Sequence, residues 1–147
     1  MTSAKVVAYS SLAIVVALYV VGAVGVPPGS LRHEVQTLPL WFPIIAGLEK
    51  RELAKWAALP CLIFWLTVMI FIWLFLLGWA RIVTGHFFPA EIAMTLVVGA
   101  ASLVGLWGSL RWRTAVRPVT ASSVFLLFGA FQFLAFRLSL IPYFSRR

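Results

Sequence analysis

Glu91 and Arg137 are ionisable residues that lie within long apolar stretches of this sequence. An ionised side chain at the centre of a membrane-spanning helix costs about 2.5–3.5 kcal/mol, and less near the helix end. Both residues fall near the same end of the expected bundle, so we expect an ion pair or a water-bridged contact between them. His86 and Arg81, from the adjoining loop, complete this candidate polar cluster.

Glu91 and Arg137 also have simpler interpretations. A carboxylate in the first turn of a helix is favoured by the helix dipole, and an arginine one turn from the interface can extend its charge to the headgroups. His86 and Glu91 are five residues apart and could form an acid–base couple, but no nucleophile or metal-ligand spacing accompanies them. The pattern therefore favours a protein that is not an enzyme and predicts no catalytic residues.

The metal-ligating residue types also predict no metal site. The two histidines, His33 and His86, are expected on opposite sides of the membrane, which argues against a bis-histidine haem site within one chain. Cys61 is the one cysteine and lies in an apolar stretch, where a buried structural thiol is expected. We therefore expect no cofactor and no metal.

Four apolar stretches must position these residues. They cover residues 5–26, 56–80, 89–110 and 119–141, and each has about the twenty residues that a helix needs to cross a hydrocarbon core of about 30 Å. Charged residues make up 11% of the chain, against roughly a quarter in a soluble domain. The predicted fold is an all-α integral membrane protein, a single membrane domain over residues 1–147 with a four-helix bundle.

The segment 27–55 separates the first two stretches. Residues 38–48 are apolar but too few to span, and they contain Pro39 and Pro43. Residues 49–55 are typical of a short charged helix. We expect the whole segment to lie at the membrane interface.

Four crossings would place both termini on one side of the membrane. The other side then carries seven of the twelve basic residues, namely Arg32, Lys50, Arg51, Lys55, Arg111, Arg113 and Arg117. The positive-inside rule makes that side cytoplasmic, so the termini are expected to face out. We expect a bacterial inner membrane protein whose net charge of +8 meets anionic lipid headgroups rather than nucleic acid.

Four residues are predicted to pack helices together. Ala101, Gly105 and Ser109 recur at intervals of four and form a row of small residues that another helix can approach closely. Packing inside the chain's own bundle is favoured over docking of another subunit. Gln132, near the middle of the last stretch, is expected to form a hydrogen bond to another helix.

Short pieces of the chain resemble the small membrane subunit of tripartite tricarboxylate transporters. They are Pro27–Ser30, Trp41–Pro43 and Phe136–Phe144. After Pro43 the sequence turns charged where that family continues apolar, so the resemblance covers scattered pieces and assigns no family.

The favoured function is that of a non-catalytic small accessory or structural subunit, with other membrane proteins as partners. Two alternatives stay open. The first is a small membrane subunit of a solute transporter, and the second is a lipid-modifying membrane enzyme that uses Glu91 and His86. A carrier acting alone is disfavoured, because Gln132 is almost the only polar group at mid-membrane depth.

Overall fold

The four apolar stretches form four long helices, and the helix ends lie within a few residues of the ends of the stretches. The computed structural model describes residues 2–24, 31–83 and 85–141. These helices are α1 (Ser3–Val24), α3 (Leu53–Leu76), α4 (Pro89–Arg111) and α5 (Pro118–Ser139), and each is long and apolar enough to cross a membrane. A proline occupies the first turn of α4 and of α5, where its missing N–H costs little. No strand occurs among the described residues.

A fifth helix, α2 (Arg32–Leu48), occupies most of the segment that was expected to lie at the interface. Pro39 and Pro43 are inside this helix and do not break it. They are four residues apart, so they share one helix face, and both are buried. Burial of that face offsets the backbone hydrogen bonds that the prolines cannot donate. The interfacial location predicted for residues 31–55 is thus not confirmed, and residues 27–30 lie outside the described part of the chain.

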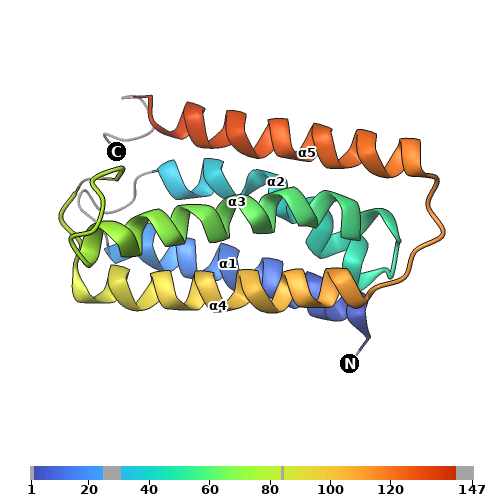
Figure 1. Cartoon of the computed structure of the whole chain (residues 1–147), viewed down its shortest axis with the longest axis horizontal. Coiled ribbons are helices and arrows are strands. Elements are labelled where there is room, and N and C mark those ends of the chain that lie inside the picture. The colour runs from blue at the N-terminus through green and yellow to red at the C-terminus, as the bar shows by residue number, and fades with distance from the viewer. Residues whose placement is uncertain (1, 25–30, 84, 142–147) are drawn as a thin grey trace.

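α2 runs antiparallel along almost the whole of α1 (Figure 1). A Cβ built on Gly22 would lie 3.4 Å from the His33 ring, near the end of α1 and the start of α2. Near the other end, a Cβ on Gly47 would lie 3.1 Å from the Ala8 side chain. At about 1.5 Å per residue the 17 residues of α2 extend about 25 Å. Its outward residues, such as Trp41 and Ile45, are apolar like those of its neighbours.

Five alternating helices put the start of α1 and the end of α5 at opposite ends of the bundle, unlike the four-crossing arrangement expected from the sequence (Figure 1). Lys5 and Arg32 therefore each lie at the end of the bundle opposite to the one expected from four crossings. The end with the start of α1, here named the basic end, carries Lys5, Lys50, Arg51, Lys55, Arg111, Arg113 and Arg117. The other, named the opposite end, carries Arg32, Arg81 and Arg137 among the described residues, while Arg146 and Arg147 lie outside them.

α3 lies at the centre of the bundle and packs on all four other helices. α4 packs on α1 and α3, whereas α5 packs on α2 and α3 (Figure 1). α4 and α5, although consecutive in the chain, therefore do not pack on each other as an antiparallel pair. Residues 112–117, which connect α4 to α5, contain no helical turn. At about 3.3 Å per residue this connection is long enough to lead from the end of α4, past the start of α3, to the start of α5.

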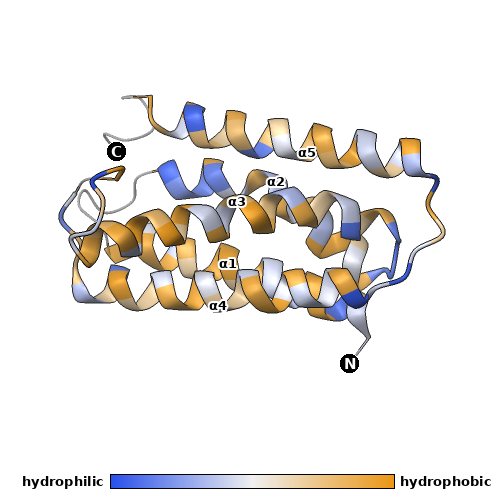
Figure 2. Cartoon of the chain, viewed as in Figure 1, coloured by the Kyte–Doolittle hydropathy of each residue, from blue (hydrophilic) through white to orange (hydrophobic). Residues whose placement is uncertain are grey.

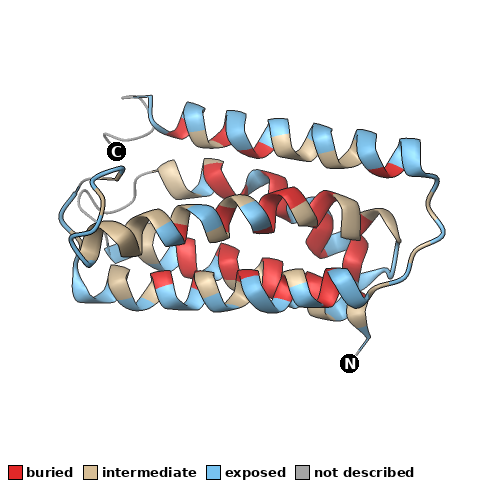
Figure 3. Cartoon of the chain, viewed as in Figure 1, coloured by how far each residue is buried: buried red, intermediate tan, exposed pale blue. Residues whose placement is uncertain are grey.

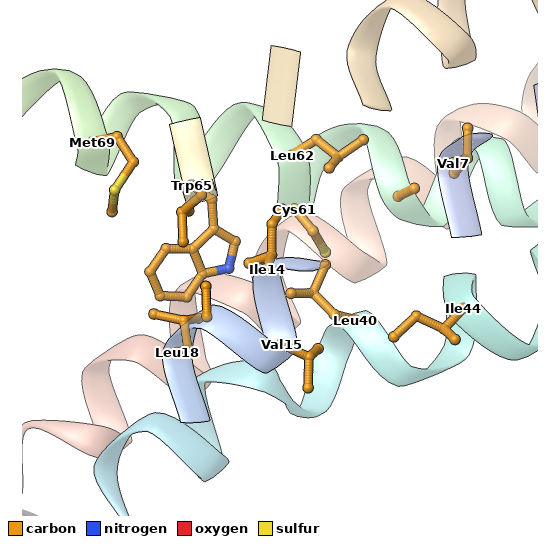
Figure 4. Packing of buried hydrophobic residues seen from close by; sticks show 13 residues of the cluster. Val7, Ile14, Val15, Leu18, Leu40, Ile44, Cys61, Leu62, Trp65 and Met69 are labelled. Atoms are coloured by element: carbon orange, nitrogen blue, oxygen red, sulfur yellow. The ribbon is translucent and has the colours of Figure 1, made fainter. Parts of the chain in front are cut away.

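The core lies between α1, α2 and α3, where the buried faces of these helices meet (Figure 3). Trp65 and Leu62 of α3 pack among Ile14 of α1 and Leu40 of α2 (Figure 4). The buried residues of α3 are not confined to one face, since the consecutive residues 60–62 are all buried, as expected of a helix that packs on several neighbours. Apolar side chains also cover the outward faces, and hydrophilic residues gather at the two ends (Figure 2). This distribution fits a bundle whose solvent is lipid.

Candidate functional site

A buried polar network joins α2 to α5 towards the opposite end of the bundle. Gln36 Nε2 donates a hydrogen bond to Ser139 Oγ at 2.9 Å, and Ser139 Oγ donates to the Phe136 carbonyl at 2.6 Å. His33 Nδ1 lies 3.1 Å from Gln36 Oε1. Since Gln36 Oε1 can only accept, His33 Nδ1 carries the proton in this contact.

Gln132 lies about two turns before Ser139 and extends the network towards the middle of α5. Its Nε2 donates to the Gln36 carbonyl oxygen at 3.0 Å, which is the cross-helix contact expected of an amide within a span. The Gln132 side chain is fully buried, and its Oε1 has no hydrogen-bond partner among the described residues. The network therefore connects the helices and retains one unused acceptor.

Arg32 and His33, in the first turn of α2, lie outside the four candidate spans and form the charged edge of this network. Burial lowers the pKa of His33, and the neighbouring Arg32 lowers it further, while Gln36 and Glu91 oppose the change. Burial also lowers the pKa of Arg32, and the charge of Glu91 opposes it. Arg32 Nε is buried with no partner among the described residues. Glu91 thus acts electrostatically on the start of α2.

The structure does not bring Glu91 and Arg137 together. α4 and α5 pack on α3 and not on each other, and no Glu91–Arg137 ion pair is present in the described part of the chain. Glu91 Oε2 instead accepts a hydrogen bond from the Phe88 backbone N–H at 2.9 Å. This contact satisfies one of the free N–H groups at the start of α4, which is the simpler role expected of a first-turn carboxylate.

His86, Arg81 and Arg137 are exposed at the opposite end. His33 lies at that same end because α2 begins there, so the expectation that the two histidines occupy opposite sides was wrong. Among the described residues no group of three or more His, Cys, Asp or Glu side chains could hold a metal ion. No hydrogen bond joins His86 to Glu91 within that part of the chain.

The small residues of α4 face α1 and α3. A Cβ on Gly105 would lie 2.9 Å from Leu62 Cδ1 and 3.0 Å from Ser10 Cβ. Ser109 is fully buried, and Ala101 packs against the core. The row therefore serves contacts within the chain.

Gln36 and Ser139 are the members of this buried network that the sequence interpretation missed. Gln36 lies in the segment predicted to be interfacial, and Ser139 lies near the end of the last apolar stretch. A polar side chain is ordinary at both places, so its type alone does not indicate burial. The available signal was periodicity: Gln36, Pro39, Leu40 and Pro43 share one face of an unbroken helix. Reading residues 32–48 as a helix would have placed Gln36 on its buried face.

The chain matches no protein-family model, and it matches neither a curated protein nor a solved structure.

Proposed function

We propose that this protein is a non-catalytic multi-pass membrane subunit that binds the transmembrane helices of a larger complex. The observation that carries the proposal is the use of the interior polar side chains. Gln36, Gln132 and Ser139 form hydrogen bonds that join α2 to α5, and Glu91 caps α4. Polar groups used in these contacts stabilise the bundle and are not free to bind substrate. Gln132 Oε1 and the hydroxyls of Ser102 and Ser109 are buried without a partner among the described residues, but they are too few and too scattered to line a polar path through the bundle.

An apolar groove between α3 and α4 supports this proposal. Its volume is about 480 Å³, and it is lined by Leu66, Met69, Ile70, Trp73, Leu74, Leu77, Thr95, Leu96, Gly99, Ala100 and Leu103. Gly99 and Ala100 leave room on α4 for a neighbouring helix to approach closely. We propose that a helix of the partner protein occupies this groove.

Charge distribution supports an orientation. Seven basic residues lie at the basic end and three at the opposite end among the described residues. By the positive-inside rule we propose that the basic end faces the cytoplasm. The start of α1 would then be cytoplasmic, in contrast to the expectation from four crossings.

Site-specific photocrosslinking in intact membranes tests the subunit proposal. A photoreactive phenylalanine analogue at Leu103, in the groove, should form an adduct of one discrete mass with a membrane protein, and the same analogue at Val16 on α1 serves as the matched exposed control. Replacing Ala100 by Trp fills the groove and should abolish the adduct. The absence of a protein adduct at Leu103, together with a stable monomer in mild detergent, would contradict the proposal.

A further inference from the structure

Two helices of this protein end in the same backbone motif, but the residue in the left-handed conformation just after the helix differs between them. After α3, the N–H groups of Gly78 and Trp79 donate to the carbonyls of Phe75 and Leu74. After α2, the N–H groups of Lys50 and Arg51 donate in the same pattern to Gly47 and Ala46. Gly78 has φ +76° and Lys50 has φ +58°. Both turns are therefore Schellman motifs with a left-handed residue after the helix.

Lysine is unfavourable at this position, because a Cβ opposes the left-handed conformation that glycine adopts freely. Lys50 is the one non-glycine residue with positive φ among the described residues. Strained residues of this kind cluster at binding sites, where the side chain has a use that glycine could not supply.

Lys50 lines two surface grooves at the basic end. One groove, of about 500 Å³, is lined by Thr2, Lys5, Tyr9 and Lys50. The other, of about 270 Å³, is lined by Thr2, Ser3, Ala4, Lys50, Arg111, Trp112 and Arg113. Lys50 thus belongs to both grooves, and four cationic side chains line them without any carboxylate.

The acidic residues of the basic end are already used elsewhere. Glu49 forms an ion pair with Arg51 at 2.6 Å, the one ion pair in the described part of the chain. Glu52 accepts a hydrogen bond from the Ala115 N–H at 2.8 Å. The cations that line the grooves therefore remain available to an external anion.

Aromatic residues place the grooves at the level of lipid headgroups. The Arg111 guanidinium lies 4.2 Å from the centre of the Trp107 ring, and Trp107 is exposed on the outward side of α4. Tyr9 and Trp112 line the grooves themselves. Tryptophan and tyrosine are enriched at the membrane–water interface, where basic pockets bind phosphate headgroups.

We propose that the two grooves bind the phosphate-bearing headgroup of an anionic phospholipid, with Lys50 as the cation common to both. This inference rests on the membrane location in the proposed function, but it does not depend on the identity of a protein partner. Failure of the crosslinking experiment would therefore leave it intact.

Replacing Lys50 by Gly separates binding from folding. K50G removes the strain, so the lipid-free protein in detergent should gain about 2–4 °C in Tm. Its affinity for phosphatidylglycerol, measured by native mass spectrometry of the full chain, should fall about fivefold. K50R should retain wild-type affinity and show no gain in Tm, and the substitutions K5Q and R113Q should each weaken binding.

The matched control is R117Q, which removes one positive charge from an exposed residue of the basic end that lines neither groove and forms no ion pair among the described residues. Its phosphatidylglycerol affinity should stay within about twofold of wild type. Equal losses in R117Q and K50G would overturn the proposal, as would equal affinity for phosphatidylglycerol and phosphatidylcholine. Displacement of the lipid by inorganic phosphate at equal concentration would show a soluble ligand instead and would also overturn it.

Discussion

At the residue scale, Gln36 takes part in both hydrogen bonds between α2 and α5: its Nε2 donates to Ser139 Oγ, and its carbonyl oxygen accepts from Gln132 Nε2. Its side chain is only 2% exposed, yet all of its polar groups have partners. Gln132, by contrast, makes one hydrogen bond to a carbonyl. The two glutamines therefore differ in what their removal would leave unpaired.

We expect Q36L to destabilise the protein more than Q132L. The first change leaves the His33 Nδ1–H without a partner and removes the hydrogen bond that Ser139 Oγ accepts, although Ser139 still donates to the Phe136 carbonyl. The expected cost is about 1–3 kcal/mol. The second removes one cross-helix hydrogen bond, worth about 0.6 kcal/mol on average within membranes. Unfolding of both variants in the same detergent measures the difference. An equal or reversed order would show that Gln36 is not the centre of the network.

We expect His33 to make stability depend on pH. Burial and Arg32 lower its pKa in the folded protein below the ordinary value of 6.5, while Gln36 and Glu91 oppose the shift. Between the folded and unfolded pKa values the unfolded chain binds more protons. The stability that His33 contributes is therefore complete above pH 6.5 and declines as the pH falls below it, by at most about 1.4 kcal/mol per pH unit.

Thermal unfolding between pH 8 and pH 5 tests this dependence. H33N should remove the decline below pH 6.5, and H86N, at the exposed histidine of the same end, should retain it. A decline of equal size in wild type and H33N would assign the effect to another group.

At the scale of elements, α1 and α4 can approach closely because small residues line their contact. A Cβ on Gly108 would lie 2.7 Å from Val6 Cγ1, and one on Gly105 would meet Ser10. A larger side chain at such a position would disturb the packing of α1 on α4 within this chain. The sequence alone left open the alternative that it would displace another subunit.

We expect G105L to destabilise the bundle by about 1–3 kcal/mol, since the added side chain has no space between α4, Leu62 and Ser10. The matched control is A93L on the exposed side of the same helix, which should change stability by less than about 0.5 kcal/mol. Unfolding in detergent measures both. A tolerated G105L would mean that α1 and α4 are farther apart than described.

The sequence was sufficient to predict α1, α3, α4 and α5, because length and apolar content decide whether a helix can span. It was insufficient for α2. Pro39 and Pro43 each remove a backbone donor, and only the tertiary burial of their shared face shows that the helix tolerates this. The changed location of His33 followed from this one helix, whereas Glu91 and Arg137 stay apart because α4 and α5 pack on α3 and not on each other.

At the scale of the whole molecule, the charge asymmetry is retained although the chain path differs from the one expected. Lys5 joins the basic end, and Arg32 moves to the opposite end. The end with most positive charge is the same in both arrangements, but in the structure it contains the start of α1. The central claim is therefore that α2 returns the chain along the bundle, so that Thr2 and Arg113 share an end and His86 lies at the other.

Cysteine labelling in oriented vesicles tests this claim most directly. In a background with the buried Cys61 replaced by Ala, single cysteines at Thr2, Arg113 and His86 are treated with a membrane-impermeant maleimide. We predict labelling of the first two positions from one side only and of the third from the other side only. Labelling of positions 2 and 86 from the same side, with 113 from the other, would contradict the path of α2.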